Sequence, residues 1–289
     1  MNETRDEVPQ GCTHDCASCS AGCASRQEPQ SLLEPMNEHS DIRNVVAVVS
    51  GKGGVGKSLV TALLAAGLNR AGRRVGVLDA DITGPSIPRV FGLEGRQVMD
   101  SAYGLLPLRT EAGLEVMSLN LLLEDPSAPV LWRGPVIAGV VRQFWHEVCW
   151  GVLDELFIDM PPGTGDVPLT VYQSLPIRGI VIVTSPQELV GMIVEKAVNM
   201  AELMGVPVLG IVENMSYYEC PDCGARHALF GESHVEEIAA RHGIQTVARI
   251  PLDPAIARAA DAGALGDLEA PWLEGLSAAL LRRLEGEAK

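Results

Sequence analysis

Short apolar runs alternate with longer amphipathic stretches from Asn44 to the end of the chain. Several runs are continuously apolar, which is typical of strands that are covered by helices on both faces. The pattern predicts strands at Val45–Val49, Arg74–Asp79, Leu114–Ser118, Leu156–Asp159, Ile180–Thr184, Pro207–Val212 and Thr246–Ile250. It predicts helices at Lys57–Ala71, Val136–Val148, Leu189–Met204, His234–His242 and Trp272–Leu284. This alternation favours right-handed crossovers and a mostly parallel α/β sheet with helices on both faces.

Residues 1–43 lack this pattern. The segment contains many Ser, Glu, Gln and Pro residues, four of the seven cysteines and no lysine. Without apolar periodicity it cannot bury enough surface to offset the entropy of ordering it. We therefore predict a mobile cysteine-rich tail over 1–43, which a metal could fold, and one main domain over 44–289.

The composition excludes several classes of function. The 22 basic and 37 acidic residues give a net charge of −15, and aromatic residues make up 4% of the chain. General nucleic-acid binding is not expected, because the chain lacks both a basic field and stacking platforms. No apolar stretch approaches the roughly 18 residues of a membrane span, and the start of the chain does not resemble a secretory signal. We predict a cytoplasmic protein without a membrane role.

The strongest motif matches the pattern G-x-x-x-x-G-K-[ST] of a phosphate-binding loop. It consists of Gly51, Lys52, Gly53, Gly54, Val55, Gly56, Lys57 and Ser58. It follows a predicted strand and opens a predicted helix, which is the context that the motif needs. Glycines let backbone N–H groups surround phosphate oxygens, and the helix N-terminus adds positive charge. We predict that Lys57 contacts the β- and γ-phosphates of ATP and that Ser58 ligates Mg²⁺.

Aspartates follow two predicted strands. Asp79 and Asp81 lie at the end of one, and Asp159 ends another. Taken alone, each could be a strand-end or helix-cap residue. Together they lie at the carboxyl edge, where α/β sheets bind ligands, and this favours a site.

The loop sequence KGGVGKS resembles the deviant Walker A loop of the MinD/Mrp/ParA class of dimeric P-loop ATPases. The resemblance implies a P-loop NTPase fold and a homodimer in which Lys52 reaches the partner's nucleotide. It also implies that Asp81 orients the attacking water, that Asp159 lies near Mg²⁺, and that residues 161–166 form a switch loop.

Within that class, the strings LDADITGPSIP, IDMPPGTGD, ENMSYYECPDCG and IPLDP resemble the Mrp family of iron–sulfur cluster carrier ATPases, over about 44–261. The resemblance implies that Asn214 reads the adenine base and that Pro251 lies beside it. It also implies a protein that carries a [4Fe–4S] cluster and transfers it to apoproteins, coupled to ATP binding and hydrolysis.

Cys220 and Cys223 form a CxxC motif, so both thiolates can face one metal. Zn²⁺ and iron–sulfur clusters usually take four protein ligands, and this motif supplies two. The family resemblance implies that two chains share one cluster. His227 lies close by in the sequence, so a zinc knuckle is an open alternative.

The tail cysteines Cys12, Cys16, Cys19 and Cys23 provide a complete thiolate set within a short segment. A [4Fe–4S] cluster, zinc, a cluster in transit and unligated thiols all stay open there, and His14 could add a ligand. Cys149, by contrast, is expected to be a buried core residue.

Two other functions compete with cluster transfer. One is spatial regulation by a MinD- or ParA-like ATPase, which would leave the six clustered cysteines unexplained. The other is an ATPase that holds structural zinc. Iron with acid-labile sulfide, zinc, or no metal in anaerobically purified protein would separate the three.

Overall fold

The computed structural model describes residues 32–81, 86–122, 134–163, 165–186 and 190–286. The chain divides into two units, Met1–Leu33 and Glu34–Lys289. The larger unit thus begins before the predicted boundary at Asn44, because residues from Glu34 onward contact the domain. The backbone N–H of Glu34 donates to the Ser174 carbonyl at 2.8 Å, and Trp145 Nε1 donates to the Glu34 carbonyl at 3.1 Å. The tail cysteines Cys12, Cys16, Cys19 and Cys23 lie outside the described residues.

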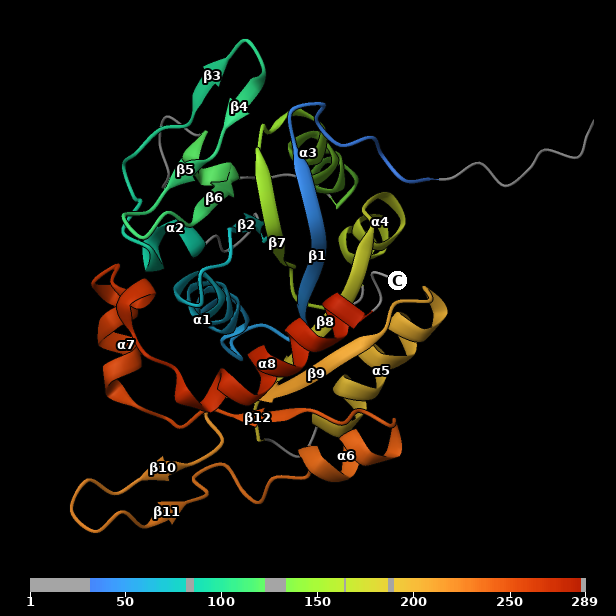
Figure 1. The fold of residues 1–289 in the computed structure, drawn as a ribbon. Coiled ribbons are helices and arrows are strands. Elements are labelled where there is room, and N and C mark those ends of the chain that lie inside the picture. The colour runs from blue at the N-terminus through green and yellow to red at the C-terminus, as the bar shows by residue number, and fades with distance from the viewer. Residues whose placement is uncertain (1–31, 82–85, 123–133, 164, 187–189, 287–289) are drawn as a thin grey trace, which may run out of the picture. The chain divides into compact units, whose positions relative to one another are not determined.

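An eight-stranded sheet crosses the larger unit in the order β12-β9-β8-β1-β7-β2-β6-β5 (Figure 1). Its strands are β1 (Asp41–Ser50), β2 (Val75–Asp79), β5 (Leu108–Arg109), β6 (Glu115–Ser118), β7 (Val152–Asp159), β8 (Ile177–Thr184), β9 (Val208–Glu213) and β12 (Val247–Arg249). Every neighbouring pair is parallel except β5 with β6. The predicted mostly parallel sheet is confirmed.

Helices cover both faces of this sheet, as predicted. One face carries α3 (Gly134–Glu147), α4 (Asp166–Ser174), α5 (Val190–Leu203) and α6 (Val235–Arg241); the other carries α1 (Lys57–Arg70), α2 (Ile87–Val90), α7 (Pro254–Asp261) and α8 (Pro271–Gly286). Alternate residues of β1 enter the two cores, so Val45 and Ala47 pack on one face and Val46 and Val48 on the other. Within the described ranges, no helix has both the length and the apolar character needed to cross a membrane.

Two strands begin earlier than their apolar runs. β1 starts at Asp41 and β7 at Val152, where the sequence still contains charged residues. These charges have partners. Glu155 is fully buried and its Oε1 accepts from Arg73 at 2.5 Å, while Asp154 pairs with Arg74 at 3.3 Å. The apolar pattern stops at these charged residues. Their arginine partners lie on another segment, so the local sequence does not show that the strand continues.

Two small hairpins project from the main sheet. The first pairs β3 (Met99–Ser101) with β4 (Gly104–Leu106), and the second pairs β10 (Tyr218–Glu219) with β11 (Arg226–His227). In Figure 1 the second hairpin extends away from the body beyond β12. It contains the CxxC motif, so the predicted metal ligands lie on a protrusion.

Candidate functional site

Several central strands end at one edge of the sheet, where the candidate nucleotide site lies. β1 ends at Ser50 and leads into the phosphate loop, and α1 then starts at Lys57. β2 and β7 end side by side, with Asp79 opposite Asp159 in register. The fold therefore brings the loop and both acidic strand ends together, as expected for a ligand site of an α/β sheet.

Lys57 is the centre of this site. Its Nζ lies 2.7 Å from Oδ1 of Asp159 and 3.5 Å from Oδ2 of Asp81, and its side chain is 5% exposed. Ser58 Oγ donates to Oδ2 of Asp159 at 2.5 Å. The structure thus brings together four of the residues that the sequence indicated.

Glycine is required at two positions of the loop. Gly54 and Gly56 have φ values of 80° and 82°, in the left-handed region that side chains disfavour. Gly56 also precedes α1 as its N-cap. A Cβ atom there would lie 2.2 Å from Nδ2 of Asn214, so this glycine permits a close approach as well as a turn.

Asn214 lies against the phosphate loop. Its Nδ2 donates to the carbonyl of Val55 at 2.9 Å, and the residue is buried. Its expected contact with adenine stays a prediction. Pro251 is buried just after β12 and lines a cavity of about 590 Å³ with Tyr217 and Leu252.

The rest of the loop is more accessible. Gly51 and Lys52 are partly buried, and Gly53 and Gly54 are exposed. The Lys52 carbonyl accepts a hydrogen bond from Ser50 Oγ at 3.0 Å. The action of Lys52 on a partner's nucleotide is an expectation that one chain does not test.

Two buried residues of the site were not assigned a role from the sequence. Asp79 accepts from Ser118 Oγ and from the backbone N–H of Asp81, both at 3.1 Å. Thr61 Oγ1 donates to Asp159 at 2.9 Å, one helical turn after Lys57. The sequence could have indicated Thr61 as a residue of the site, because residues four apart share one face of a helix.

Burial controls the electrostatics of the two strand-end carboxyls. Burial raises the pKa of Asp79 well above its ordinary value, and the nearby Asp159 adds to this increase. Burial also raises the pKa of Asp159, but the charge of Lys57 opposes it. Lys57 therefore offsets part of the cost of burying the Asp159 carboxylate.

The donor set fits Mg²⁺. This ion prefers oxygen ligands, and the Ser58 hydroxyl and the Asp159 carboxylate lie within hydrogen-bond distance of each other. Both belong to the carboxyl edge where the phosphates are expected.

Cys220 and Cys223 lie on the turn of the β10–β11 hairpin. We call residues 217–232 the CxxC hairpin. The Cys220 N–H donates to the Ala225 carbonyl at 2.9 Å, and the Gly224 N–H donates to the Cys220 carbonyl at 2.9 Å. Cys223 is exposed and Cys220 partly so. The Asp222 and Cys223 N–H groups hold the pKa of the Cys220 thiol below its ordinary value, which favours the ligating thiolate.

The other candidate ligand of this hairpin is His227. It lies on β11, paired in register with Tyr218, and is exposed. Among the residues with described positions, no three His, Cys, Asp or Glu side chains are arranged to hold a metal ion. Cys149 corrects an expectation: it is partly exposed rather than buried, because it lies beyond α3 with its Sγ 3.8 Å from the His39 carbonyl.

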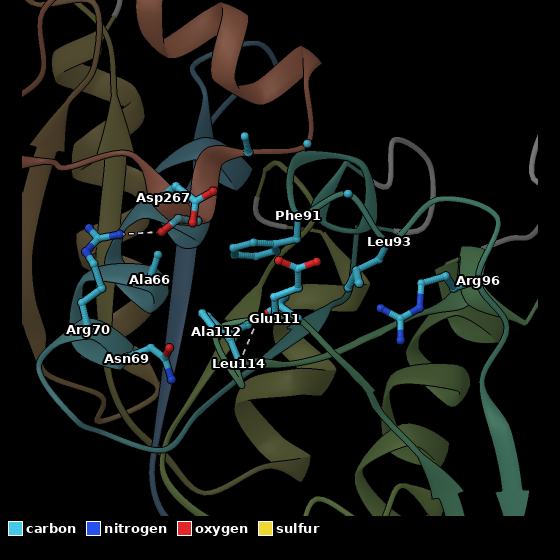
Figure 2. Close-up of a pocket in the computed structure, with 15 residues that line it drawn as sticks. Ala66, Asn69, Arg70, Phe91, Leu93, Arg96, Glu111, Ala112, Leu114 and Asp267 are labelled. Atoms are coloured by element: carbon cyan, nitrogen blue, oxygen red, sulfur yellow. Dashed lines mark hydrogen bonds between the residues drawn. The ribbon is translucent and has the colours of Figure 1, made fainter.

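A different cavity, of about 280 Å³, lies at the other end of α1 (Figure 2). Arg70 closes one side of it by donating to the carbonyls of Gly266 and Leu268, at 2.5 and 3.0 Å. Phe91 and Glu111 also line it. A helix rises about 1.5 Å per residue, so the length of α1 separates this cavity from Lys57 by roughly 20 Å. It is not part of the nucleotide site.

Known proteins are similar to this chain in sequence. An iron-sulfur cluster carrier protein of Methanocaldococcus jannaschii is 48% identical over 238 residues, covering 82% of this chain and 81% of that protein. The cytosolic Fe-S cluster assembly factor CFD1 of Yarrowia lipolytica is 45% identical over 219 residues, covering 74% and 75%.

Solved structures are similar to this chain in fold. A nucleotide-binding protein from Archaeoglobus fulgidus, in complex with ADP, is 49% identical with a TM-score of 0.74, covering 81% of this chain and 91% of that one. The Aquifex aeolicus MinC:MinD complex matches at 22% identity, with a TM-score of 0.59 and coverage of 85% and 97%, and shows the fold alone. The sequence model described as ParA, NUBPL iron-transfer P-loop NTPase, matches residues 41–274. Since that match spans most of the domain and close relatives share almost half of its residues, the chain belongs to the NUBPL iron-transfer family of ParA-type P-loop NTPases.

Proposed function

We propose that this protein binds an iron–sulfur cluster and transfers it to apoproteins, using ATP binding and hydrolysis to control the transfer. The observation that carries the proposal is the accessible pair of Cys220, partly exposed, and Cys223, exposed, on a hairpin that leaves the same sheet edge as the phosphate loop. Thiolates suit iron–sulfur chemistry, and an accessible pair suits cargo that must leave again. The carrier proteins among the relatives support it.

ATP is the substrate of the phosphate loop in this proposal. Lys57 now neutralises Asp159 and Asp81, and phosphate oxygens would take over that role as ATP binds. Ser58 would ligate Mg²⁺ with Asp159 beside it, and the ion supplies charge neutralisation on the phosphates. Asp81 would orient the attacking water.

The remaining parts of the nucleotide site are assigned by family resemblance. Asn214 and Pro251 would contact the adenine base, and Lys52 would act on the partner's nucleotide. Of these, Asn214 already lies against the loop that holds the phosphates. Each assignment can be tested by substituting that residue alone and measuring nucleotide binding and hydrolysis.

The cluster is proposed to bridge two chains. Each CxxC hairpin supplies two thiolates and a [4Fe–4S] cluster takes four, so a two-fold symmetric dimer completes the set. Cys12, Cys16, Cys19 and Cys23 would form a separate set within one tail. A reducing cytoplasm would keep all of these thiols available.

The test is the metal content of anaerobically purified protein. We expect iron with acid-labile sulfide, loss of the hairpin-bound share in Cys220→Ala and Cys223→Ala, and no loss in the matched control Cys149→Ala. The reconstituted protein should activate an apo-ferredoxin. Zinc in place of iron would support the structural-zinc alternative, and no metal would support a spatial regulator.

A further inference from the structure

The CxxC hairpin has little structure of its own to fix its direction. Its ladder consists of the residue pairs Tyr218–His227 and Glu219–Arg226. A two-stranded ribbon of this size is not stable alone. The orientation of Cys220 and Cys223 therefore depends on contacts outside this ladder. These are the attachment of the two hairpin ends to the sheet and the Leu252 N–H, which donates to the Tyr217 carbonyl at 2.7 Å.

Both ends are attached to one side chain, Glu213 at the end of β9. Ser216 lies just before the hairpin, and its Oγ donates to Oε2 of Glu213 at 2.5 Å. Ser233 lies just after it, and its Oγ donates to Oε1 at 2.8 Å. Each carboxylate oxygen thus holds one end. Arg249 completes the network, since its Nη2 donates to Ser233 Oγ at 3.1 Å and its Nε lies 3.9 Å from Glu213 Oε2.

The carboxylate of this network is shielded from water, whereas the Arg249 side chain is 38% exposed. Glu213 is 1% exposed and Ser216 is 6% exposed. A buried carboxylate is stable only when its oxygens are hydrogen-bonded and its charge is balanced. The two hairpin ends supply hydrogen bonds to both oxygens of Glu213, and Arg249, which also pairs with Glu236 at 3.3 Å, supplies a nearby positive charge.

The next residue along the chain contacts the phosphate loop. Asn214 Nδ2 donates to the Val55 carbonyl at 2.9 Å and lies 2.2 Å from the position that a Cβ of Gly56 would take. Its backbone N–H donates to the carbonyl of Thr184 on β8 at 2.8 Å. Two consecutive residues therefore contact the two candidate sites.

The turn between these contacts is sterically restricted. Met215 has a φ of 56°, in the left-handed region that is unfavourable for a residue with a Cβ atom. On its far side, the Ser216 N–H donates to the Ile250 carbonyl at 2.9 Å. Such backbone is retained where the surrounding contacts determine it, which is common at functional sites. Met215 is thus a short and restricted connection between Asn214 and the start of the CxxC hairpin.

We propose that Glu213 is a positioning residue for the Cys220–Cys223 pair, and that the step from Glu213 to Asn214 links nucleotide binding in the phosphate loop to the position of the CxxC hairpin. The ligand that acts through this link is a nucleoside triphosphate at the loop. The use of the link to release cargo rests on the proposed function, but the link itself does not require a cluster.

Hydrogen exchange of the metal-free full chain tests the link directly. Amides of residues 217–232 should change their exchange rates when a non-hydrolysable ATP analogue with Mg²⁺ binds. In Glu213→Ala the same amides should exchange at least about fivefold faster and respond less to nucleotide, since two hydrogen bonds to the hairpin ends are lost. Ser101→Ala is the matched control, because Ser101 Oγ anchors the unrelated β3–β4 hairpin through the Gly104 carbonyl.

Further variants separate positioning from general stability. Asn214→Ala, at saturating analogue, should keep the slow exchange of the hairpin but lose its response to nucleotide. Glu213→Gln should restore part of the protection, because its amide oxygen still accepts one hydroxyl. Should Glu213→Ala fail to fold, the double variant Ser216→Ala with Ser233→Ala removes the same contacts and keeps the buried carboxylate with Arg249.

The proposal is overturned if bound analogue leaves the exchange of 217–232 unchanged in the parent protein. It is also overturned if the Glu213 or double-serine variants exchange like the parent. A second readout is iron release from the reconstituted protein to a chelator, whose nucleotide dependence should be lost in Asn214→Ala. If the parent binds no iron while the exchange results hold, the proposed function fails and the link survives.

Discussion

The candidate nucleotide site and the CxxC hairpin lie at the same edge of the sheet, but the charged centre of the first is buried and the second is exposed. Lys57 and Asp159 are buried within the two-sided core, with side chains 5% and 0% exposed. By contrast, every residue from 221 to 232 is exposed. A site that must stabilise charge needs fixed dipoles in a dry environment, whereas a site that passes on its cargo needs access. The difference indicates that the hairpin depends on its anchors; under the proposed function it would also depend on a second chain.

The largest contrast is expected from the cysteines. Cys220→Ala should abolish the bridged cluster, because two of its four ligands vanish by symmetry. The free energy of unfolding of the metal-free chain should change by no more than about 0.5 kcal/mol, as for most surface substitutions. Iron analysis and thermal melts check both parts. A variant that retains the parent's hairpin-bound iron would contradict the site.

Lys57→Ala tests the buried side of the comparison. ATP hydrolysis should fall about 100-fold or more, the usual effect of removing one preorganised charge-stabilising donor. The metal-free chain should also lose stability, since Asp159 stays buried without its ion pair. Steady-state hydrolysis and denaturant melts measure these effects. Lys196→Ala, an exposed lysine on α5, is the control and should match the parent. Hydrolysis at the parent rate by Lys57→Ala would refute the assignment.

Two left-handed glycines sharpen the comparison further. Gly56→Ala should lower the free energy of unfolding by roughly 2–4 kcal/mol, because backbone strain adds to a clash with Asn214. Gly224 has a φ of 69° but nothing within 4 Å of its Cβ position. Gly224→Ala should loosen the hairpin and change the global melt by no more than about 1–2 kcal/mol. Equal melting temperatures for the two variants would remove the distinction.

The smallest effect concerns an ion pair at the far end of β7. Hydrogen bonds from Arg74 hold the pKa of Asp154 below its ordinary value, so ionised Asp154 stabilises the folded state. That benefit is complete above the unfolded pKa, about 3.9, and is lost as the pH falls through the lowered folded pKa. Asp154→Asn should be less stable than the parent by up to about 1 kcal/mol at pH 7, with hydrolysis unchanged. Denaturant melts across pH should show the difference closing in acid; a constant difference would exclude the titration.

Continuous apolar runs made the main sheet predictable, and motif spacing gave the phosphate loop and the CxxC pair. Short elements were not predicted, because they contain too few residues to show a periodicity: β10 and β11 have two residues each, and α2 has four. The helix α4 was not predicted from the sequence, because it begins at the end of the segment expected to be a switch loop. Charged strand ends such as Glu155 were missed because their partners lie on other segments.

The contacts of Glu213 illustrate what sequence patterns do not contain. Ser216 and Ser233 flank a long hairpin, and nothing in their spacing indicates that they meet on one carboxylate. Asp79 was visible as a strand-end residue, but its burial beside Asp159 required the register of β2 and β7. Such relations arise only from tertiary packing.

The cluster shared by two chains is the central claim. It is tested most directly by measuring the iron content of a variant that lacks the tail cysteines. Cys12, Cys16, Cys19 and Cys23 would all be changed to Ala in the full chain, which preserves the contacts of residues from Glu34 onward. After anaerobic reconstitution we expect about two irons per chain, four per dimer, with sedimentation showing a dimer that weakens when the cluster is removed. A monomer that holds about four irons per chain at all concentrations would contradict a cluster bridged by Cys220 and Cys223 of two chains.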